Sequence, residues 1–213
     1  MALIASTLAR LERLKLDVLF EDFPAIEDST MPLLRHLDLS LGSSSGHFRS
    51  VSFGELPLLR SVVLNRTASM CARLPWAQLT SLFMSRVYLH DCIPILSQTS
   101  TLIHCELHLW CSDRDNVITL PCLESLVLTC SDFEGCASHP EILKSFITPS
   151  LRNLRFPERF LGNEPILGLT DFISKSVTKL QDVCITGKRS VSNEAYRDAL
   201  QSVPKLSFSN REY

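Results

Sequence analysis

Residues 104–108, with the sequence His-Cys-Glu-Leu-His, form the densest grouping of chemically active side chains in this 213-residue chain. Successive side chains on an extended strand point to opposite faces, so His104, Glu106 and His108 would project from the same face. Imidazole and carboxylate groups are zinc ligands, but the helical His-Glu-x-x-His spacing of zinc proteases is absent. The positions expected beside them on neighbouring strands are Ser81, Phe83, Ser85, Ser125, Val127 and Thr129, none of which is a good further ligand. We therefore predict a polar binding surface without a metal, on which two histidines would make binding depend on pH between about 5 and 8.

A second group of metal-ligand residue types comprises Cys130, Cys136 and His139. Its spacing matches no zinc module, and ordinary packing is the preferred interpretation. Nucleophile elbows, dinucleotide-binding glycine turns and Walker loops are all missing from the sequence, and the acidic residues show no pairing typical of a general acid and base. The sequence therefore predicts a protein that is not an enzyme and that needs no cofactor.

Composition excludes several classes of partner. A formal net charge of −2, a pI of about 6.3 and scattered basic residues give no reason to expect nucleic acid binding. The apolar runs are far shorter than the ~20 residues that cross a bilayer, so no membrane partner is expected. The first nine residues lack the pattern of a signal peptide, which predicts an intracellular protein, cytoplasmic or nuclear, with free thiols.

Leucine recurs along the chain at a regular spacing. There are 36 leucines, and a leucine-like residue occupies positions 1, 4 and 6 of nine short frames that begin at residues 11, 34, 59, 79, 102, 123, 151, 180 and 203. The frames are 20–29 residues apart, with a mean of 24, which is the spacing of leucine-rich repeats.

The remaining frame positions indicate the local structure. Positions 3, 5 and 7 of the nine frames hold 27 residues, of which only Val63, Phe83, Val127 and Cys184 are apolar. This alternation predicts a short strand in each frame, with positions 4 and 6 facing inward and 3, 5 and 7 outward. Nine strands of an antiparallel sandwich would be the alternative. Helix-like segments at 91–98, 140–147, 164–174 and 192–203 favour parallel strands joined by crossovers, whereas 17–33 and 40–58 are less regular.

These features together predict an α/β fold. We expect a single leucine-rich-repeat domain over residues 1–213, a curved horseshoe solenoid of about nine irregular repeats. Parallel strands would line its concave face, and short helices and turns its convex face. Residues 1–10 would form a partial N-terminal helix or cap, and 203–213 the last strand and tail. Position 9 of the frames lacks the usual asparagine, so packing and irregular hydrogen bonds would have to hold the turns together.

The outward strand positions would form a continuous concave surface, where solenoid proteins usually bind their partners. Phe83 and Val127 would flank Glu106 and make a small apolar patch. The predicted surface for a protein or peptide target comprises His36, Asp38, Ser61, Val63, Asn65, Ser81, Phe83, Ser85, His104, Glu106, His108, Ser125, Val127, Thr129, Asn153 and Arg155.

Three segments have the style of a known family: 74–82 (Leu-Pro-Trp-Ala-Gln-Leu-Thr-Ser-Leu), 95–107 (Ile-Leu-Ser-Gln-Thr-Ser-Thr-Leu-Ile-His-Cys-Glu-Leu) and 120–126 (Leu-Pro-Cys-Leu-Glu-Ser-Leu). They resemble the divergent leucine-rich-repeat region of fungal F-box proteins, and the resemblance covers roughly residues 8–208. It implies the substrate-recognition part of a ubiquitin-ligase adaptor. The first frame begins at Leu11, which leaves no room for an F-box before it, so a Skp-type linker is expected as a partner only if an F-box lies upstream. The alternative is a stand-alone leucine-rich-repeat scaffold or ligand sensor with no ubiquitin-ligase link.

Overall fold

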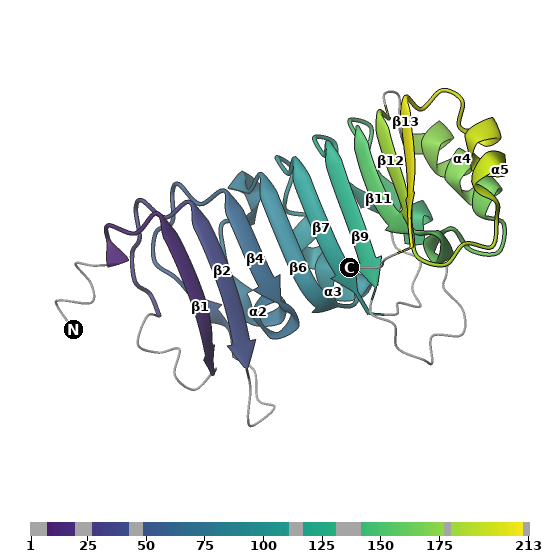
Figure 1. Ribbon diagram of the computed structural model, residues 1–213. Helices are drawn as coiled ribbons and strands as arrows, with labels where there is room; N and C mark the ends of the chain where they lie inside the picture. Colours follow the sequence, from purple (N-terminus) through teal and green to yellow (C-terminus); the bar gives the residue numbers. More distant parts are fainter. Residues whose placement is uncertain are drawn as a thin grey trace.

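The protein has a mixed α/β structure built on one large parallel sheet (Figure 1). This computed structural model describes residues 8–19, 27–42, 49–110, 117–130, 142–176 and 180–210. The sheet has nine strands in the order of the sequence. They are β1 (Arg13–Leu19), β2 (His36–Gly42), β4 (Ser61–Asn65), β6 (Ser81–Val87), β7 (His104–Leu109), β9 (Ser125–Cys130), β11 (Asn153–Pro157), β12 (Asp182–Thr186) and β13 (Lys205–Ser209).

Each strand of this sheet begins at position 3 of a predicted frame, so the nine predicted strands are confirmed. Every neighbouring pair is parallel, for example β4 with β6, where Val62 pairs with Leu82 and Leu64 with Met84. The antiparallel sandwich is therefore wrong. Residues 1–7 and 211–213, which belong to the expected N-terminal cap and C-terminal tail, lie outside the described residues.

The inward positions of the strands form the hydrophobic core. Leu39, Leu64, Leu107 and Leu128 occupy position 6 of their frames and are fully buried. Burying one leucine contributes about 1.5–3 kcal/mol, so a row of them dominates the stability of the sheet. On β1 the inward residues are only half-buried, because among the described strands this one pairs on one side only.

A recurrent backbone contact joins the start of each strand to the one before it. The carbonyl of Arg35 accepts hydrogen bonds from the N–H groups of both Arg60 and Ser61, each at 3.0 Å. Carbonyls in the same place before the other strands do likewise: Glu12, Arg60, Thr80, Ile103, Glu124 and Arg152. Adjacent strands therefore begin level with one another, which keeps equivalent frame positions in register.

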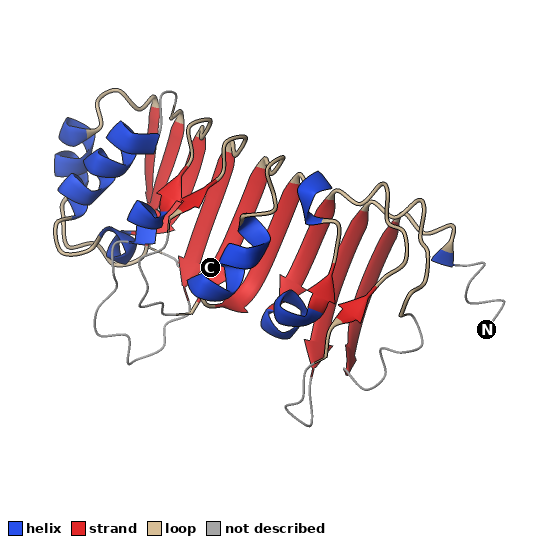
Figure 2. Ribbon diagram, turned by 180° about the vertical axis from the view of Figure 1, so that it is seen from behind, coloured by secondary structure: helices blue, strands red, loops and turns tan. Residues whose placement is uncertain are grey.

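Two of the helices, α2 (Arg66–Cys71) and α3 (Leu89–Leu96), cover one face of the sheet, as the view from behind shows (Figure 2). The apolar stripe of α3 buries Leu89, Cys92 and Ile95 against the core. The segment predicted at 91–98 is thus helical, but the helix starts at Leu89, so Pro94 lies inside it and not in its first turn. No helix in the described part of the chain is long and apolar enough to cross a membrane.

Two further helices with described bounds are α4 (Pro165–Ser176), which confirms the predicted helical segment 164–174, and α5 (Asn193–Ala199), which confirms the first part of the segment predicted at 192–203 and ends four residues before that segment does. The Ser192 hydroxyl accepts a hydrogen bond from the N–H of Ala195 at 3.2 Å and caps α5. The α-helix predicted at 140–147 is wrong over its described residues, 142–147. A 3-10 turn (Ile142–Ser145) is followed by strand β10 (Phe146–Ile147), because Phe146 is buried and pairs with Ile118 of β8 (Ile118–Thr119). Two further 3-10 turns span Trp76–Gln78 and Glu158–Leu161.

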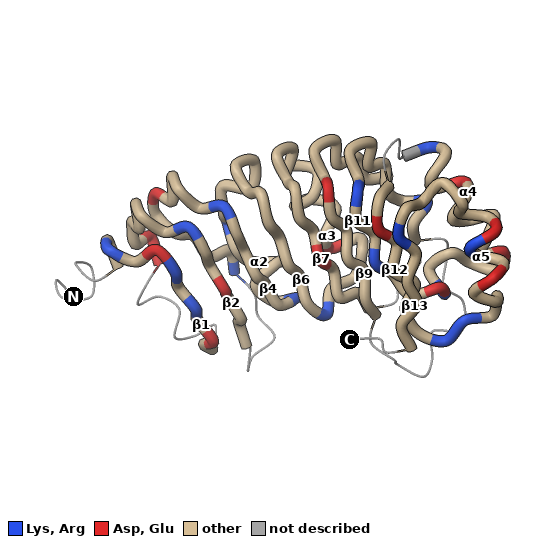
Figure 3. Tube along the Cα trace, turned by 45° about the horizontal axis from the view of Figure 1, so that its top comes forward, with Lys and Arg blue, Asp and Glu red and all other residues tan. Residues whose placement is uncertain are grey.

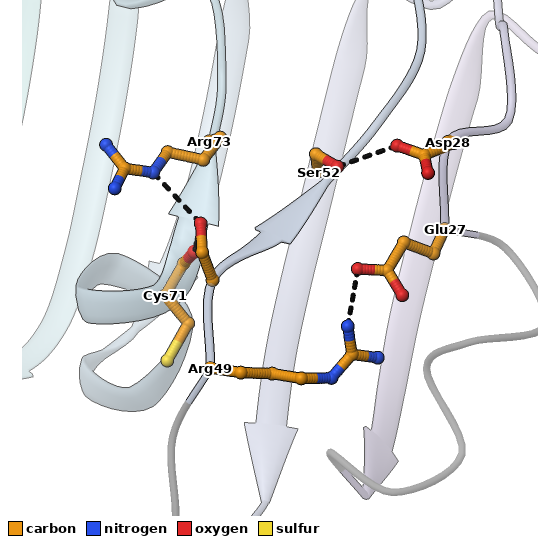
Figure 4. Close-up of polar contacts among 7 residues, drawn as sticks. Glu27, Asp28, Arg49, Ser52, Cys71 and Arg73 are labelled. Atoms are coloured by element: carbon orange, nitrogen blue, oxygen red, sulfur yellow. Dashed lines mark hydrogen bonds and ion pairs between the residues drawn. The ribbon is translucent and has the colours of Figure 1, made fainter.

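Polar side chains link successive turns at the N-terminal end of the molecule (Figure 4). Here β3 (Val51–Ser52) pairs with β5 (Ala72–Arg73) in a small parallel sheet. Arg49 Nη1 lies 2.6 Å from Glu27 Oε1, the Ser52 hydroxyl donates to Asp28 Oδ1 at 2.7 Å, and Arg73 Nε donates to Ser50 Oγ at 2.9 Å. Each contact joins residues 22–24 apart, so these bonds connect one turn to the next.

Candidate functional site

The strand register brings all sixteen predicted surface residues into three rows across the sheet. The first row holds position 3 of each frame: His36, Ser61, Ser81, His104, Ser125 and Asn153. The second holds position 5: Asp38, Val63, Phe83, Glu106, Val127 and Arg155. The third holds position 7: Asn65, Ser85, His108 and Thr129. These rows lie on the sheet face opposite α2 and α3 (Figures 1 and 2).

Charge is unevenly distributed along the sheet (Figure 3). The middle strands are nearly uncharged, since β4 and β9 carry no charged residue, β6 only Arg86 and β7 only Glu106. Charged pairs flank this region. Lys15 lies 2.9 Å from Asp38 at one end, and Lys205 pairs with Asp182 at the other. The hydrogen bond from Lys15 to Asp38 raises the pKa of Lys15, so Asp38 is engaged within the protein.

Glu106 lies at the centre of the face between Phe83 and Val127. Burial raises the pKa of its carboxyl group, and the positive charge of Arg155 partly opposes this shift. In the described part of the chain, the Glu106 carboxylate forms no hydrogen bond and no close ion pair. An acid between apolar neighbours can accept a cationic group from a binding partner, since the partner's charge would offset the cost of desolvating the carboxylate.

The two histidines on the same strand have different surroundings. His104 is exposed, whereas His108 is half-buried next to the bulge at which the pairing of β6 with β7 shifts between Ser85 and Val87. Burial lowers the pKa of His108, and the positive charge of Arg86 lowers it further. His108 is therefore neutral over more of the pH range than a free histidine.

Two predicted surface residues are engaged or covered within the protein itself. Asn65 accepts hydrogen bonds through Oδ1 from the N–H groups of Ala68 (2.9 Å) and Leu41 (3.2 Å), and its amide donates to the Leu41 carbonyl (3.0 Å). It caps α2 and links two turns, so its polar atoms are already used. Thr129 is buried, with 9% of its surface exposed. The other residues of the three rows are therefore better placed to contact a partner than these two.

The face is hollowed in its C-terminal half by a depression of about 280 Å³. Ser125, Val127, Asn153 and Arg155 line it and belong to the predicted surface. The other side chains that project into it are Asp182, Cys184, Lys205 and Ser207. These four residues occupy outward positions of the last two frames. Their frame positions could therefore have placed them in the predicted binding surface from the sequence alone.

An aromatic and cationic cluster at the carboxyl ends of β4, β6 and β7 could not be predicted from the frames. The guanidinium carbon of Arg66 lies 4.7 Å from the centre of the Tyr88 ring and 5.4 Å from that of Trp110. Asp91 Oδ2 is 3.3 Å from Arg66 Nε and holds this cation in place. The cluster lies at the edge of the face, where stacked Arg, Tyr and Trp are typical of residues that contribute strongly to protein interfaces.

Within the described residues, no group of three or more His, Cys, Asp and Glu side chains is arranged to hold a metal ion. Cys136 and His139 of the weighed cluster lie outside the described residues. Cys92 and Cys105 are buried free thiols, and burial raises the pKa of Cys105 to about 12. A thiol with so high a pKa is a poor nucleophile at neutral pH, so these two cysteines belong to the core.

Comparison of the chain with models of protein families, with curated proteins and with solved structures finds no match.

Proposed function

We propose that this chain is a leucine-rich-repeat solenoid whose concave face binds a protein or peptide. Three observations support the repeat architecture: frames 20–29 residues apart, strands in sequence order, and the same carbonyl contact between successive strand starts. Repeats of 20–29 residues that bury their apolar faces against neighbouring repeats are typical of leucine-rich-repeat solenoids.

The observation that carries the binding function is the row Val63, Phe83, Glu106 and Val127 on the sheet face without helices. Large apolar side chains around a charged group, inside a polar surround, are the composition of interface hot spots. The flanking serines and histidines of the first row would provide that surround. The partner would be a protein segment that presents an apolar side chain together with a cationic one.

For its cellular role, we propose the substrate-recognition part of an F-box-type ubiquitin-ligase adaptor, which is the function implied by the resemblance to fungal F-box proteins. A stand-alone scaffold or ligand sensor is the alternative. The two differ in one partner, since only an adaptor works together with a Skp-type linker, and it does so through an F-box.

The binding face is tested by affinity capture from a cell extract with matched variants. Phe83→Ala and Glu106→Lys should each lose the proteins that the unchanged chain captures. Met70→Ala removes an exposed apolar side chain from α2 on the opposite face, and Glu194→Lys reverses an exposed charge on α5; both should retain them. Equal capture by all four variants would refute binding by this face.

The cellular role is tested with a purified Skp-type linker. The adaptor proposal expects the linker to bind a transcript-encoded chain in which an F-box precedes Leu11, and expects no binding by residues 1–213 alone. A captured partner that never co-purifies with ligase components, from either chain, would favour the stand-alone scaffold.

A further inference from the structure

A second hollow, of about 650 Å³, lies at the carboxyl ends of the last three strands and away from the three rows of the concave face. Its walls come from three separate turns: Glu158, Arg159 and Gly162 follow β11, residues 187–190 follow β12, and Asn210 follows β13. Parallel strands present their carboxyl ends at the same edge of a sheet, so side chains far apart in sequence converge here. Such edges are frequent ligand sites in α/β proteins.

The walls of this pocket have a defined backbone shape. Gly162 and Gly187 both line it, and both have φ of 78°, a conformation that glycine adopts without strain. The N–H of Gly187 donates to the Ser209 carbonyl at 2.9 Å, which ties the turn after β12 to the end of β13. The pocket is therefore built by ordered turns.

Three cationic side chains line the pocket, Arg159, Lys188 and Arg189, against one carboxylate, Glu158. Glu158 is 3% exposed, and internal donors occupy both of its oxygens. Oε1 accepts from the backbone N–H and the hydroxyl of Ser190, the latter at 2.6 Å, and Oε2 accepts from the Tyr196 hydroxyl at 2.9 Å. The acid thus holds the wall together, and internal donors take up the hydrogen-bonding capacity of its oxygens.

Arg189 is fixed in position by neutral groups alone. Its guanidinium donates to Asn193 Oδ1 (3.1 Å), to Asn210 Oδ1 (2.9 Å) and to the carbonyls of Gly187 and Ser209 (3.2 and 3.3 Å). None of these acceptors carries a charge, and among the described residues no carboxylate forms a direct ion pair with the guanidinium. The positive charge is therefore held in a fixed position, which favours binding of an anion because little order has to be created.

Arg159 and Lys188 add to this charge from two sides. Arg159 Nη2 donates to the Cys130 carbonyl at 3.3 Å, and Lys188 is an exposed residue of the lining. In Figure 3 a stretch of Lys and Arg lies between the ends of β13 and α5, where this turn runs. The local balance is thus positive, although the whole chain has a net charge of −2.

We propose that this pocket binds a phosphate group. Two guanidinium groups and an ammonium group suit the several oxygens and the double charge of a phosphate. The volume of about 650 Å³ exceeds that of a free phosphate ion, so the group would be carried by a phosphorylated side chain or by a phosphorylated small molecule.

The test is a titration of the full ¹⁵N-labelled chain with sodium phosphate, with sodium chloride at the same ionic strength as the reference. The amide signals of Gly187, Ser190 and Asn210 should shift and saturate with phosphate only. Lys188→Gln should weaken binding by about fivefold, as loss of one charge-assisted contact does. The matched control Lys175→Gln, on the exposed side of α4, should leave binding unchanged. Arg189→Lys keeps the charge but removes the planar donors and should also weaken binding.

Equal shifts with phosphate and chloride, or equal losses in the Lys188 and Lys175 variants, would overturn the proposal. If Arg189→Lys unfolds the chain, as circular dichroism would show, the Lys188 pair decides alone. Two short peptides that differ only in carrying serine or phosphoserine then distinguish the two possible carriers of the phosphate group, a protein side chain and a small molecule. Tighter binding of the phosphopeptide than of inorganic phosphate identifies a phosphorylated protein, and binding no tighter identifies a small molecule.

Discussion

Glu106 is a carboxylate placed between Phe83 and Val127, and this has a consequence for stability that depends on pH. Its pKa is raised in the folded protein, so as pH rises through about 4.5 the unfolded chain loses this proton before the folded chain does. The charged residue therefore lowers the free energy of unfolding at neutral pH and has no such effect near pH 3.

Glu106→Gln should accordingly raise the free energy of unfolding at pH 7, by less than about 1 kcal/mol because the site is partly open to solvent. At pH 3 the gain should vanish. Urea denaturation at the two pH values measures the difference, and Glu55→Gln, at an exposed turn position, is the control expected to show no gain at either. A gain of equal size at both pH values would contradict a titration origin.

Asn65 gives the opposite case, a polar residue whose importance is structural. Asn65→Ala removes the cap of α2 and two hydrogen bonds to the backbone of Leu41. The expected loss is about 2–3 kcal/mol of unfolding free energy. Asn153→Ala, at an exposed position of the same sheet face, should change stability by less than about 0.5 kcal/mol. Equal effects in thermal unfolding would show that the Asn65 contacts contribute little.

At the scale of strands, equivalent leucines differ in how many neighbours cover them. Leu107 of β7 is fully buried between β6 and β9, while Leu16 of the edge strand β1 occupies the same frame position and is half-buried. Leu107→Ala should cost about 3–5 kcal/mol, because it leaves a cavity that the two flanking strands cannot close. Leu16→Ala should cost about 1–2 kcal/mol. Chemical denaturation of the two variants compares them directly, and equal losses would mean that β1 is covered as fully as β7.

The large sheet could be predicted from the sequence because its signal is local. Alternation within five to seven residues decides which side chains face inward, and that pattern is present in every frame. Parallel pairing also followed, since the segments between frames are long enough for crossovers. The four helix-like segments had weaker signals, and three of them are helices.

Features that depend on distant pairing were missed. The two small sheets, β3 with β5 and β8 with β10, rest on two-residue contacts that leave no periodic pattern in the sequence. The pairing of β10 with β8 also explains why residues 146–147 form a strand where a helix was predicted. The cationic pocket was also missed, because its residues come from three turns and become neighbours only through the strand order. For the same reason, the capping role of Asn65 could not be distinguished from an outward surface position.

For the whole molecule, we expect a gradient of protection from hydrogen exchange along the sheet. The amides of β6, β7 and β9 lie between strands that are themselves paired on both sides, whereas β1 and β13 are edges. Local opening at an edge breaks fewer contacts, so it requires less free energy. Exchange measured by mass spectrometry should be slowest over β6, β7 and β9 and fastest over β1 and β13. Uniform protection, or the reverse order, would contradict this.

The strand order also bears on how the chain can fold while it is being synthesised. Within the nine-stranded sheet, each strand pairs only with the strands of that sheet made just before and just after it, and these strands begin 20–29 residues apart. The entropy cost of closing each loop is therefore nearly constant along the chain, and no pairing has to wait for a distant segment. A growing polypeptide can thus add one strand at a time to an existing edge as it leaves the ribosome, from the N-terminus onward.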